Sequence, residues 1–379
     1  MGKSNTNAHL QLASNNNSGY NVLLSMGKIS GYFFKRWKLL LNIVTILALI
    51  FTLYLIRDDL ATTLDNLTKI DAWALVLLLP IEVLNYHFQA KLYQHLFRIV
   101  GNELPYKYLY KAALELNFVN HVFPSGGAAG LSYFGLMIKN HEITGGKATL
   151  IQIIKLVMTF LSFEVLIILS LFFLALGGRV NNFTMLAAGM MSTLLVVGTG
   201  LFVFIAGKQE RINSFMEFVT RMFNRLVSRF SPSVTEAISL KRVRQIFDDF
   251  HTSFRQIQSN RQKMRAPLFY AFMCNATEIM AVYVVFIAFG KFLNVGAVIL
   301  AYGIANFAGT FSILPGGIGI YEALMTATLL ATGVSAVFSL PAIIMYRVVN
   351  TILQIPPGYY LYQKHIVKNK DAEADHLVT

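Results

Sequence analysis

Long apolar runs alternate with short polar connections along most of the chain. A membrane-spanning helix needs about 20 consecutive, mostly apolar residues. Six runs are long enough to cross a bilayer: residues 37–56, 72–97, 149–176, 183–206, 267–289 and 336–362. Residues 1–27, which precede them, are rich in Asn, Ser and Gly and predict a disordered tail.

A further apolar stretch, NFAGTFSILPGGIGIYEALMTATLL (306–330), is interrupted by Pro315, Gly316, Gly317 and Gly319. Proline removes a backbone donor and glycine weakens a helix, so the stretch does not form one continuous helix. Each arm has about 13 residues, too few to cross a bilayer. We therefore expect a re-entrant helical hairpin that enters the membrane and turns back at the glycines, within residues 295–332. Irregular backbone at that depth is stable only where protein covers it or where it lines a cavity.

The same landmarks recur in the first half of the chain. In NFVNHVFPSGGAAGLSYFGLM (117–137), Asn-Phe is followed by Pro124, Gly126 and Gly127. This pattern predicts a second re-entrant hairpin over residues 106–139. The alternative is two unrelated loops that both use glycine. A broken apolar segment that recurs in each half of a chain indicates the binding site of a transporter.

These segments divide the chain into a first membrane half (28–206), a polar insertion (207–265), a second membrane half (266–364) and a tail (365–379). In each half a span, a broken segment and another span follow one another. An odd number of turns separates equivalent spans, so the halves should point in opposite directions across the membrane. The first hairpin then enters from the cytoplasm and the second from outside, and their tips meet near the midplane. The predicted fold is an all-α polytopic membrane protein with six full spans and two re-entrant helical hairpins in an inverted repeat.

Composition supports the membrane class. The chain is 55% hydrophobic and only 13% charged, with a mean hydropathy of +0.55, whereas soluble domains carry about 25% charged residues. Its net charge of +13 does not indicate nucleic-acid binding, because the basic residues flank the apolar runs. Four Lys or Arg lie within residues 28–38 and three Lys within 364–370. Basic residues collect on the cytoplasmic side of membrane proteins, so we expect both termini in the cytoplasm and the protein in the cell membrane.

The insertion carries apolar residues at helical spacing, such as Phe215, Phe218 and Met222, opposite Arg221 and Arg225. This spacing predicts a basic amphipathic helix, and a second helix follows it. Two interpretations stay open. The pair lies along an anionic inner leaflet, or it is a small helical hairpin packed against itself.

Ionisable residues inside spans are candidate functional groups, because each costs about 2.5 to 3.5 kcal/mol to insert. Glu82 and Glu278 lie in the spans before the broken segments, and Lys155 and Arg347 lie in the spans after them. Helices that restart after the glycines would point their positive ends inward, and with Lys155 and Arg347 they form a site for an anion such as a lipid phosphate. Lys155 could instead reach the cytoplasmic interface, and Glu322 could only complement its helix N-terminus. The predicted substrate-binding residues are Glu82, Pro124, Gly126, Gly127, Lys155, Glu278, Pro315, Gly316, Gly317, Gly319, Glu322 and Arg347.

Motifs of soluble enzymes were not found. The sequence contains no H-E-x-x-H, P-loop or G-x-S-x-G motif and no paired Cys/His spacing, and Cys274 is its single cysteine. We therefore expect neither a catalytic site, nor a metal site, nor a cofactor.

The segment LPGGIGIYEALM (314–325), followed by Gly333 and MYRVVN (345–350), resembles a known family. It is similar to the transmembrane domain of lysylphosphatidylglycerol synthase/flippase, the multiple peptide resistance factor, and to its standalone flippase-like relatives. The resemblance covers roughly residues 37–362 and implies re-entrant helices and movement of lipids between leaflets. By position it assigns binding roles to Pro124, Gly126, Gly127, Pro315, Gly316, Gly317, Gly319, Glu322 and Arg347.

Two features depart from the family. Many relatives have an arginine shortly after the first glycine turn, where this chain has Ser132-Tyr133-Phe134. The soluble aminoacyl-transferring domain is not found in these residues, so we expect no synthesis of lysylphosphatidylglycerol.

Three functional hypotheses follow. The leading one is a flippase-like transporter whose partners are membrane lipids with an anionic headgroup or phosphate, and which moves a phospholipid or glycolipid. The second is a membrane-embedded enzyme acting on a lipid-linked substrate. The third is a noncatalytic partner that anchors a lipid-modifying synthase or glycosyltransferase through residues 207–265.

Overall fold

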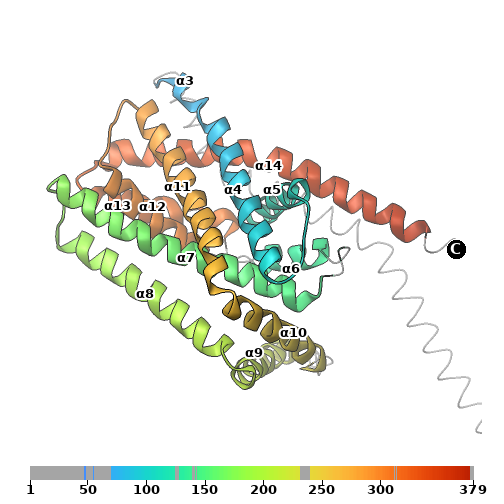
Figure 1. The fold of residues 1–379 in the computed structure, drawn as a ribbon. Coiled ribbons are helices and arrows are strands. Elements are labelled where there is room, and N and C mark those ends of the chain that lie inside the picture. The colour runs from blue at the N-terminus through green and yellow to red at the C-terminus, as the bar shows by residue number, and fades with distance from the viewer. Residues whose placement is uncertain are drawn as a thin grey trace, which may run out of the picture.

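The computed structural model describes residues 70–123, 128–138, 143–230, 240–310 and 314–375, together with residues 47, 54, 141 and 312. Three expected features therefore lie outside the described residues: the polar tail 1–27, the first span 37–56 apart from two positions, and the first hairpin's tip, with Pro124, Gly126 and Gly127. All regular structure in the described part of the chain is helical. Its helices form one elongated bundle (Figure 1).

Four described helices are long and apolar enough to cross a membrane, judged by length and composition: α7 (Gly145–Leu176), α8 (Asn182–Ala206), Arg261–Ala288 and Ala336–His365. The third comprises the short 3-10 helix η2 (Arg261–Met264) and α11 (Arg265–Ala288), and the fourth is most of α14 (Ala336–Asp375). The expected span 72–97 forms α3 (Ala72–Leu75) and α4 (Leu78–Ile99), but is not among the four. Polar side chains recur along α4, so the number of spans stays a prediction.

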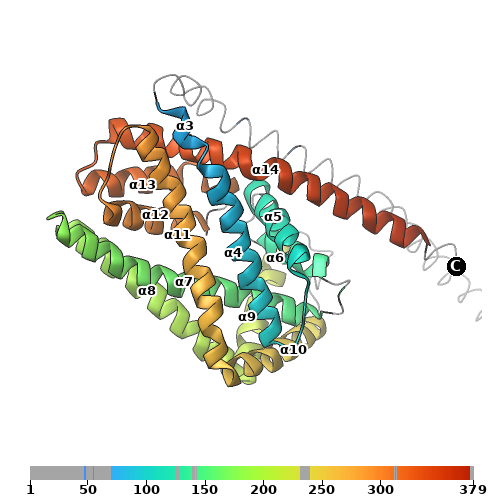
Figure 2. The same ribbon diagram turned by 45° about the horizontal axis from the view of Figure 1, so that its top comes forward.

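Helices α4 and α11 form an antiparallel pair that crosses the centre of the bundle (Figures 1 and 2). The backbone N–H of Asp71, just before α3, donates to the carbonyl of Ala288 at the end of α11 (3.0 Å). Midway along the pair, the Asn85 amide donates to the carbonyl of Cys274 (3.0 Å). The helices that precede the two broken segments, α4 and α11, therefore run in opposite directions.

Both broken segments form helical hairpins. The first consists of α5 (Tyr106–Val122) and α6 (Ala128–Ile138), and the second of α12 (Val295–Thr310) and α13 (Ile320–Ala331). They lie toward opposite ends of the bundle (Figure 1). All four helices have 17 residues or fewer, which is short of the length of about 20 that a crossing needs.

Each hairpin packs against the long helix that follows the other hairpin. The first lies on α14, where Phe118 contacts the rings of Tyr359 and Tyr362. The second lies on α7, where the Asn294 amide donates to the carbonyl of Phe173 (3.0 Å). This exchange joins the two halves over a long interface.

The second hairpin turns through the 3-10 helix η3 (Pro315–Gly317), and its backbone explains the paired glycines. Gly316 and Gly317 have φ values of 57° and 68°, in the left-handed region that disfavours residues with a Cβ. A Cβ on Gly317 would also lie 2.9 Å from the Cα of Gly309 in α12. The turn therefore needs glycine for both its backbone conformation and its close packing.

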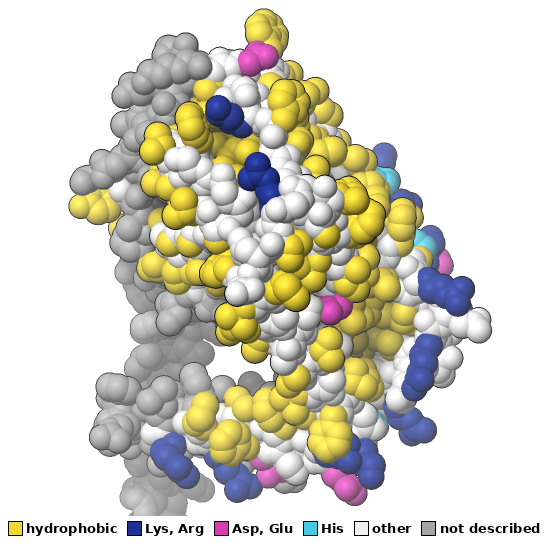
Figure 3. All heavy atoms as spheres, turned by 90° about the vertical axis from the view of Figure 1, so that its left-hand side faces the viewer, with side chains coloured by type: hydrophobic (Ala, Val, Ile, Leu, Met, Phe, Trp, Pro, Cys, Tyr) yellow, Lys and Arg dark blue, Asp and Glu magenta, His cyan; other side chains and the backbone are white. Residues whose placement is uncertain are grey.

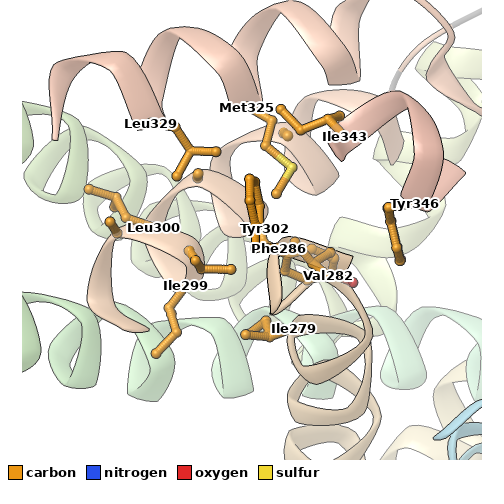
Figure 4. Packing of buried hydrophobic residues seen from close by; sticks show 14 of the residues in the cluster. Ile279, Val282, Phe286, Ile299, Leu300, Tyr302, Met325, Leu329, Ile343 and Tyr346 are labelled. Carbon is orange, nitrogen blue, oxygen red and sulfur yellow. The ribbon is translucent and has the colours of Figure 1, made fainter. Parts of the chain in front are cut away.

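Two apolar cores stabilise the bundle. One joins α11, α12, α13 and α14 and contains Phe286, Tyr302, Met325, Leu329 and Ile343 (Figure 4). The other joins α4, α5, α6 and α7. Helix α8 contributes little to either core and leaves apolar side chains exposed along one stripe: Leu186, Met190, Leu194, Val197 and Leu201. An exposed apolar stripe of this length fits a lipid-facing helix.

The polar insertion forms α9 (Gln209–Phe230) and α10 (Leu240–Ser259), and the two helices differ in burial. Phe250 and Phe254 of α10 are 3% and 5% exposed and belong to the core that contains α7. On α9, Phe218 and Met222 remain 64% and 57% exposed. In Figure 3, basic and hydrophobic side chains intermingle along this lower edge of the molecule. Helix α10 therefore packs against α7 and α8, while the outer face of α9 remains open.

Candidate functional site

A polar cavity of about 360 Å³ lies where the two hairpins meet. Helices α4, α5, α7, α11, α12 and α14 and the second hairpin's turn all contribute to its wall. Eight carboxamide side chains line it: Asn85, Gln89, Asn117, Asn120, Asn275, Asn306, Asn350 and Gln354. Three tyrosines line it as well: Tyr302, Tyr321 and Tyr346.

The end of the first hairpin's α5 approaches the turn of the second hairpin. A Cβ on Gly316 would lie 3.5 Å from the Cδ2 atom of His121, near the C-terminal end of α5. The turn of the first hairpin itself, residues 124–127, lies outside the described residues. The two broken segments nevertheless converge on one cavity, although nearly 200 residues separate Asn117 from Asn306 in the sequence.

Arg347 holds the turn of the second hairpin. Its Nη2 atom donates to the carbonyl of Gly316 (2.5 Å), its Nη1 atom lies 2.9 Å from Oε1 of Glu322, and its guanidinium lies 4.9 Å from the ring centroid of Tyr321. The other Glu322 oxygen accepts the backbone N–H of Gly319 (2.7 Å) and so caps α13. Arg347 thus lines the cavity with a charge that Glu322 already compensates.

Lys155 is the other cation in the cavity wall. Its Nζ atom donates to the hydroxyl of Tyr93 (3.1 Å) and lies 4.8 Å from the centroid of that ring. Among the described residues, no carboxylate lies within ion-pair distance of it.

A chain of hydrogen bonds along α14 connects the two buried glutamates. Gln354 donates through Nε2 to Glu82 (3.1 Å) and to the side-chain oxygen of Asn350 (2.9 Å). Asn350 donates to the Tyr346 hydroxyl (3.3 Å), which donates to Oε2 of Glu278 (2.7 Å). Tyr346, Asn350 and Gln354 recur every four residues, so one face of α14 joins the acids on α4 and α11.

The predicted site residues thus take different positions. Lys155, Glu278, Gly316 and Arg347 line the cavity. Glu82 is 6% exposed and lies one hydrogen bond behind the wall. The remaining second-half residues, Pro315, Gly317, Gly319 and Glu322, belong to the turn or to the cap of α13.

Sequence reasoning missed several residues of the cavity wall, above all Asn85, Gln89 and Gln354. A signal for them is present in the pairs Asn85–Gln89 and Asn350–Gln354, where carboxamides four residues apart share one face of an apolar helix. His87, on the same helix as Asn85 and Gln89, contacts the hydroxyl of Tyr106 at 2.8 Å and does not line the cavity.

Metal binding finds no support in the described residues, because no three His, Cys, Asp or Glu side chains cluster in a way that could hold an ion.

Comparison with known proteins gives one family and two relatives. The family model of the lysylphosphatidylglycerol synthase TM region matches residues 39–358. A UPF0104 membrane protein of Pyrococcus horikoshii is 22% identical over 237 residues, which cover 62% of this chain and 69% of that protein. A UPF0104 membrane protein of Methanothermobacter thermautotrophicus is 23% identical over 163 residues, which cover 43% of this chain and 47% of that protein. The second match therefore spans about half of the relative's length, and neither name states an activity.

Proposed function

This chain belongs to the family of the lysylphosphatidylglycerol synthase transmembrane region, and from this premise we propose that it moves a phospholipid or glycolipid between the leaflets of the cell membrane. The polar headgroup passes through the cavity, while the acyl chains stay in the bilayer. The protein acts as a transporter and makes or breaks no covalent bond.

The observation that carries this proposal is the convergence of the two broken helical segments on one polar cavity inside an otherwise apolar bundle. Polar and charged groups are costly at membrane depth and occur where a substrate path needs them. Carboxamides, tyrosines and Lys155 replace water around a headgroup, which lowers the barrier to its passage.

The membrane arrangement belongs to the same proposal. The two hairpins are re-entrant and enter from opposite sides, the six spans form an inverted repeat, and both termini lie in the cytoplasm. The antiparallel packing of α4 and α11 supports this arrangement. So does the position of each hairpin on the long helix that follows the opposite hairpin.

Lipid translocation in liposomes tests the function. The purified chain is reconstituted with a trace of head-labelled fluorescent phospholipid, and a membrane-impermeant reductant then bleaches the outer leaflet. We expect a second bleaching phase, absent from protein-free liposomes, as inner-leaflet lipid reaches the outside.

Lys155→Gln should slow this second phase, whereas Lys263→Gln, at an exposed lysine of η2, should leave it unchanged. Bleaching that matches protein-free liposomes would refute the proposal. A chemically altered lipid product without redistribution would favour the membrane-embedded enzyme instead.

A further inference from the structure

We propose that the cavity recognises one class of headgroup, a single phosphodiester that carries an uncharged, hydroxyl-rich group such as a polyol or sugar. This inference rests on the proposed function, because it names the lipid that the same cavity would carry. Three features of the cavity wall support it: its charge, its hydrogen-bonding groups and its size.

Ionisable groups of the wall, among them Arg347, Lys155 and Glu278, limit the ligand to one negative group. The carboxyl group of Glu278 already accepts the hydroxyl of Tyr346 (2.7 Å). Arg347 is compensated by Glu322 at 2.9 Å, so its charge serves the turn of the second hairpin. Lys155 has a tyrosine hydroxyl as its partner and, within the described part of the chain, no carboxylate at ion-pair distance. Lys155 is half-buried and lines the cavity, so a ligand phosphate there would supply the counter-charge that no described carboxylate gives it.

Hydrogen-bonding groups in the wall select the rest of the headgroup. Eight of the lining side chains are carboxamides, and each offers both donors and acceptors. A hydroxyl also donates and accepts, so a polyol or sugar can pair with those donors and acceptors of the carboxamides that the protein leaves unpaired. An ammonium group only donates and would leave the amide N–H groups unmatched.

Two wall groups are available for such a ligand. No described residue lies within hydrogen-bond distance of the Asn306 side chain, which faces the cavity. The hydroxyl of Tyr321 is buried and has no partner among the described residues. Buried polar groups are nearly always paired, so a hydroxyl-bearing headgroup in the cavity would give these two groups the partners that the described residues do not.

Size limits the ligand to a headgroup. The volume of about 360 Å³ lies at the lower end of the range of about 300 to 1,000 Å³ for small-molecule pockets. A phosphate with one sugar or polyol fits such a volume, whereas acyl chains do not and must remain outside.

Lipid retention tests this inference without requiring transport. The full chain, purified in detergent, is incubated with equimolar phosphatidylinositol, phosphatidylserine, phosphatidylethanolamine and a phosphate-free diglucosyl lipid, and native mass spectrometry counts the lipids bound. Phosphatidylinositol and phosphatidylserine carry the same net charge. The headgroup of the first is a neutral polyol, whereas that of the second is an amino acid. We expect phosphatidylinositol to be retained about tenfold over phosphatidylserine and phosphatidylethanolamine.

Two variants separate the features. Lys155→Gln should remove the preference of phosphatidylinositol over the diglucosyl lipid, and Asn306→Leu should reduce its preference over phosphatidylserine. Lys263→Gln should retain both preferences. Equal retention of all four lipids, or stronger retention of the two amine-bearing lipids, would overturn the inference.

The proposed function and this inference can be refuted independently of each other. Selective retention without translocation in liposomes would refute the proposed function alone. Translocation with no headgroup selectivity would refute this inference alone.

Discussion

Arg347 and Glu322 form an ion pair within the second hairpin's turn, with side chains that are 15% and 12% exposed. Arg347 also donates to the carbonyl of Gly316, so it ties α14 to the turn. Both residues therefore act as positioning residues, which shape the cavity through the hairpin.

Removing one partner of this pair should destabilise the protein more than removing both partners. A buried charge left without its partner costs about 3 to 5 kcal/mol, whereas apolar replacement of both partners is often tolerated. We expect Arg347→Met or Glu322→Met to lower the melting temperature in detergent more than the double variant does. Arg255→Met, at an exposed position of α10, is the control. Strictly additive losses would show that the pair contributes no coupling.

Gly317 should tolerate no side chain. Its φ of 68° costs an L-residue about 1 to 2 kcal/mol, and a Cβ would lie 2.9 Å from Gly309. We expect Gly317→Ala to lower both the melting temperature and the translocation rate. The matched substitution Gly189→Ala in α8, where a Cβ meets no atom within 4 Å, should be neutral or slightly stabilising. Equal effects of the two variants would argue against a constrained turn.

At the scale of elements, each hairpin contacts the helix that follows the other hairpin through a glycine. A Cβ on Gly296 of α12 would lie 2.3 Å from the carbonyl oxygen of Ser170 in α7. A Cβ on Gly358 of α14 would lie 2.5 Å from the Cβ of Phe118 in α5. Small residues let helix backbones approach closely where no hydrophobic effect drives membrane helices together.

Either glycine, replaced by alanine, should push its hairpin away from the opposite half. We expect Gly296→Ala and Gly358→Ala each to reduce translocation and thermal stability, because backbone atoms of α7 and α5 must move. The control Gly198→Ala makes the same substitution at a position of α8 where a Cβ meets no atom within 4 Å, and it should change neither translocation nor thermal stability. Full activity in both hairpin variants would show that these contacts are dispensable.

The insertion contributes unequally to stability. Phe254 of α10 is 5% exposed, and its ring centroid lies 5.9 Å from that of Phe202 in α8. Phe218 of α9, in contrast, is 64% exposed. Truncation of a buried Phe costs about 3 to 5 kcal/mol. We expect Phe254→Ala to lower the melting temperature strongly and Phe218→Ala to leave it unchanged, as measured by thermal unfolding of the purified chain. The reverse order would place the stabilising face on α9.

For the molecule as a whole, the inverted arrangement makes a prediction about the two faces of the membrane. In a Cys274→Ser background, single cysteines at Val180 and Ser335 should react with an impermeant maleimide added outside the cell. A cysteine at Ser214 of α9 should react only after permeabilisation. All three positions are exposed. Labelling of all three from one face would exclude the proposed arrangement of spans.

Much of the fold could be predicted from local properties of the chain. Long apolar runs indicated α7, α8, α11 and α14 because the bilayer sets both the length and the polarity of a spanning helix. Proline with paired glycines indicated both hairpins because these residues act on their own backbone. The polar character of α4 was underestimated, since Glu82 and Asn85 are matched by partners on other helices.

By itself, therefore, the sequence determined the helical membrane class, the two broken segments and the ionisable residues inside the bundle. Only the tertiary structure decided which of these groups have partners. Arg347 pairs with Glu322, and the two buried glutamates accept hydrogen bonds from side chains of α14. Lys155 donates to a tyrosine hydroxyl and has no carboxylate at ion-pair distance among the described residues. The tertiary structure also decided that carboxamides from five helices share one cavity. The physical reason is the distance along the chain over which each effect acts. Hydrophobicity and backbone propensity act over a few neighbouring residues, whereas the pairing of polar side chains depends on how helices far apart in the chain pack together.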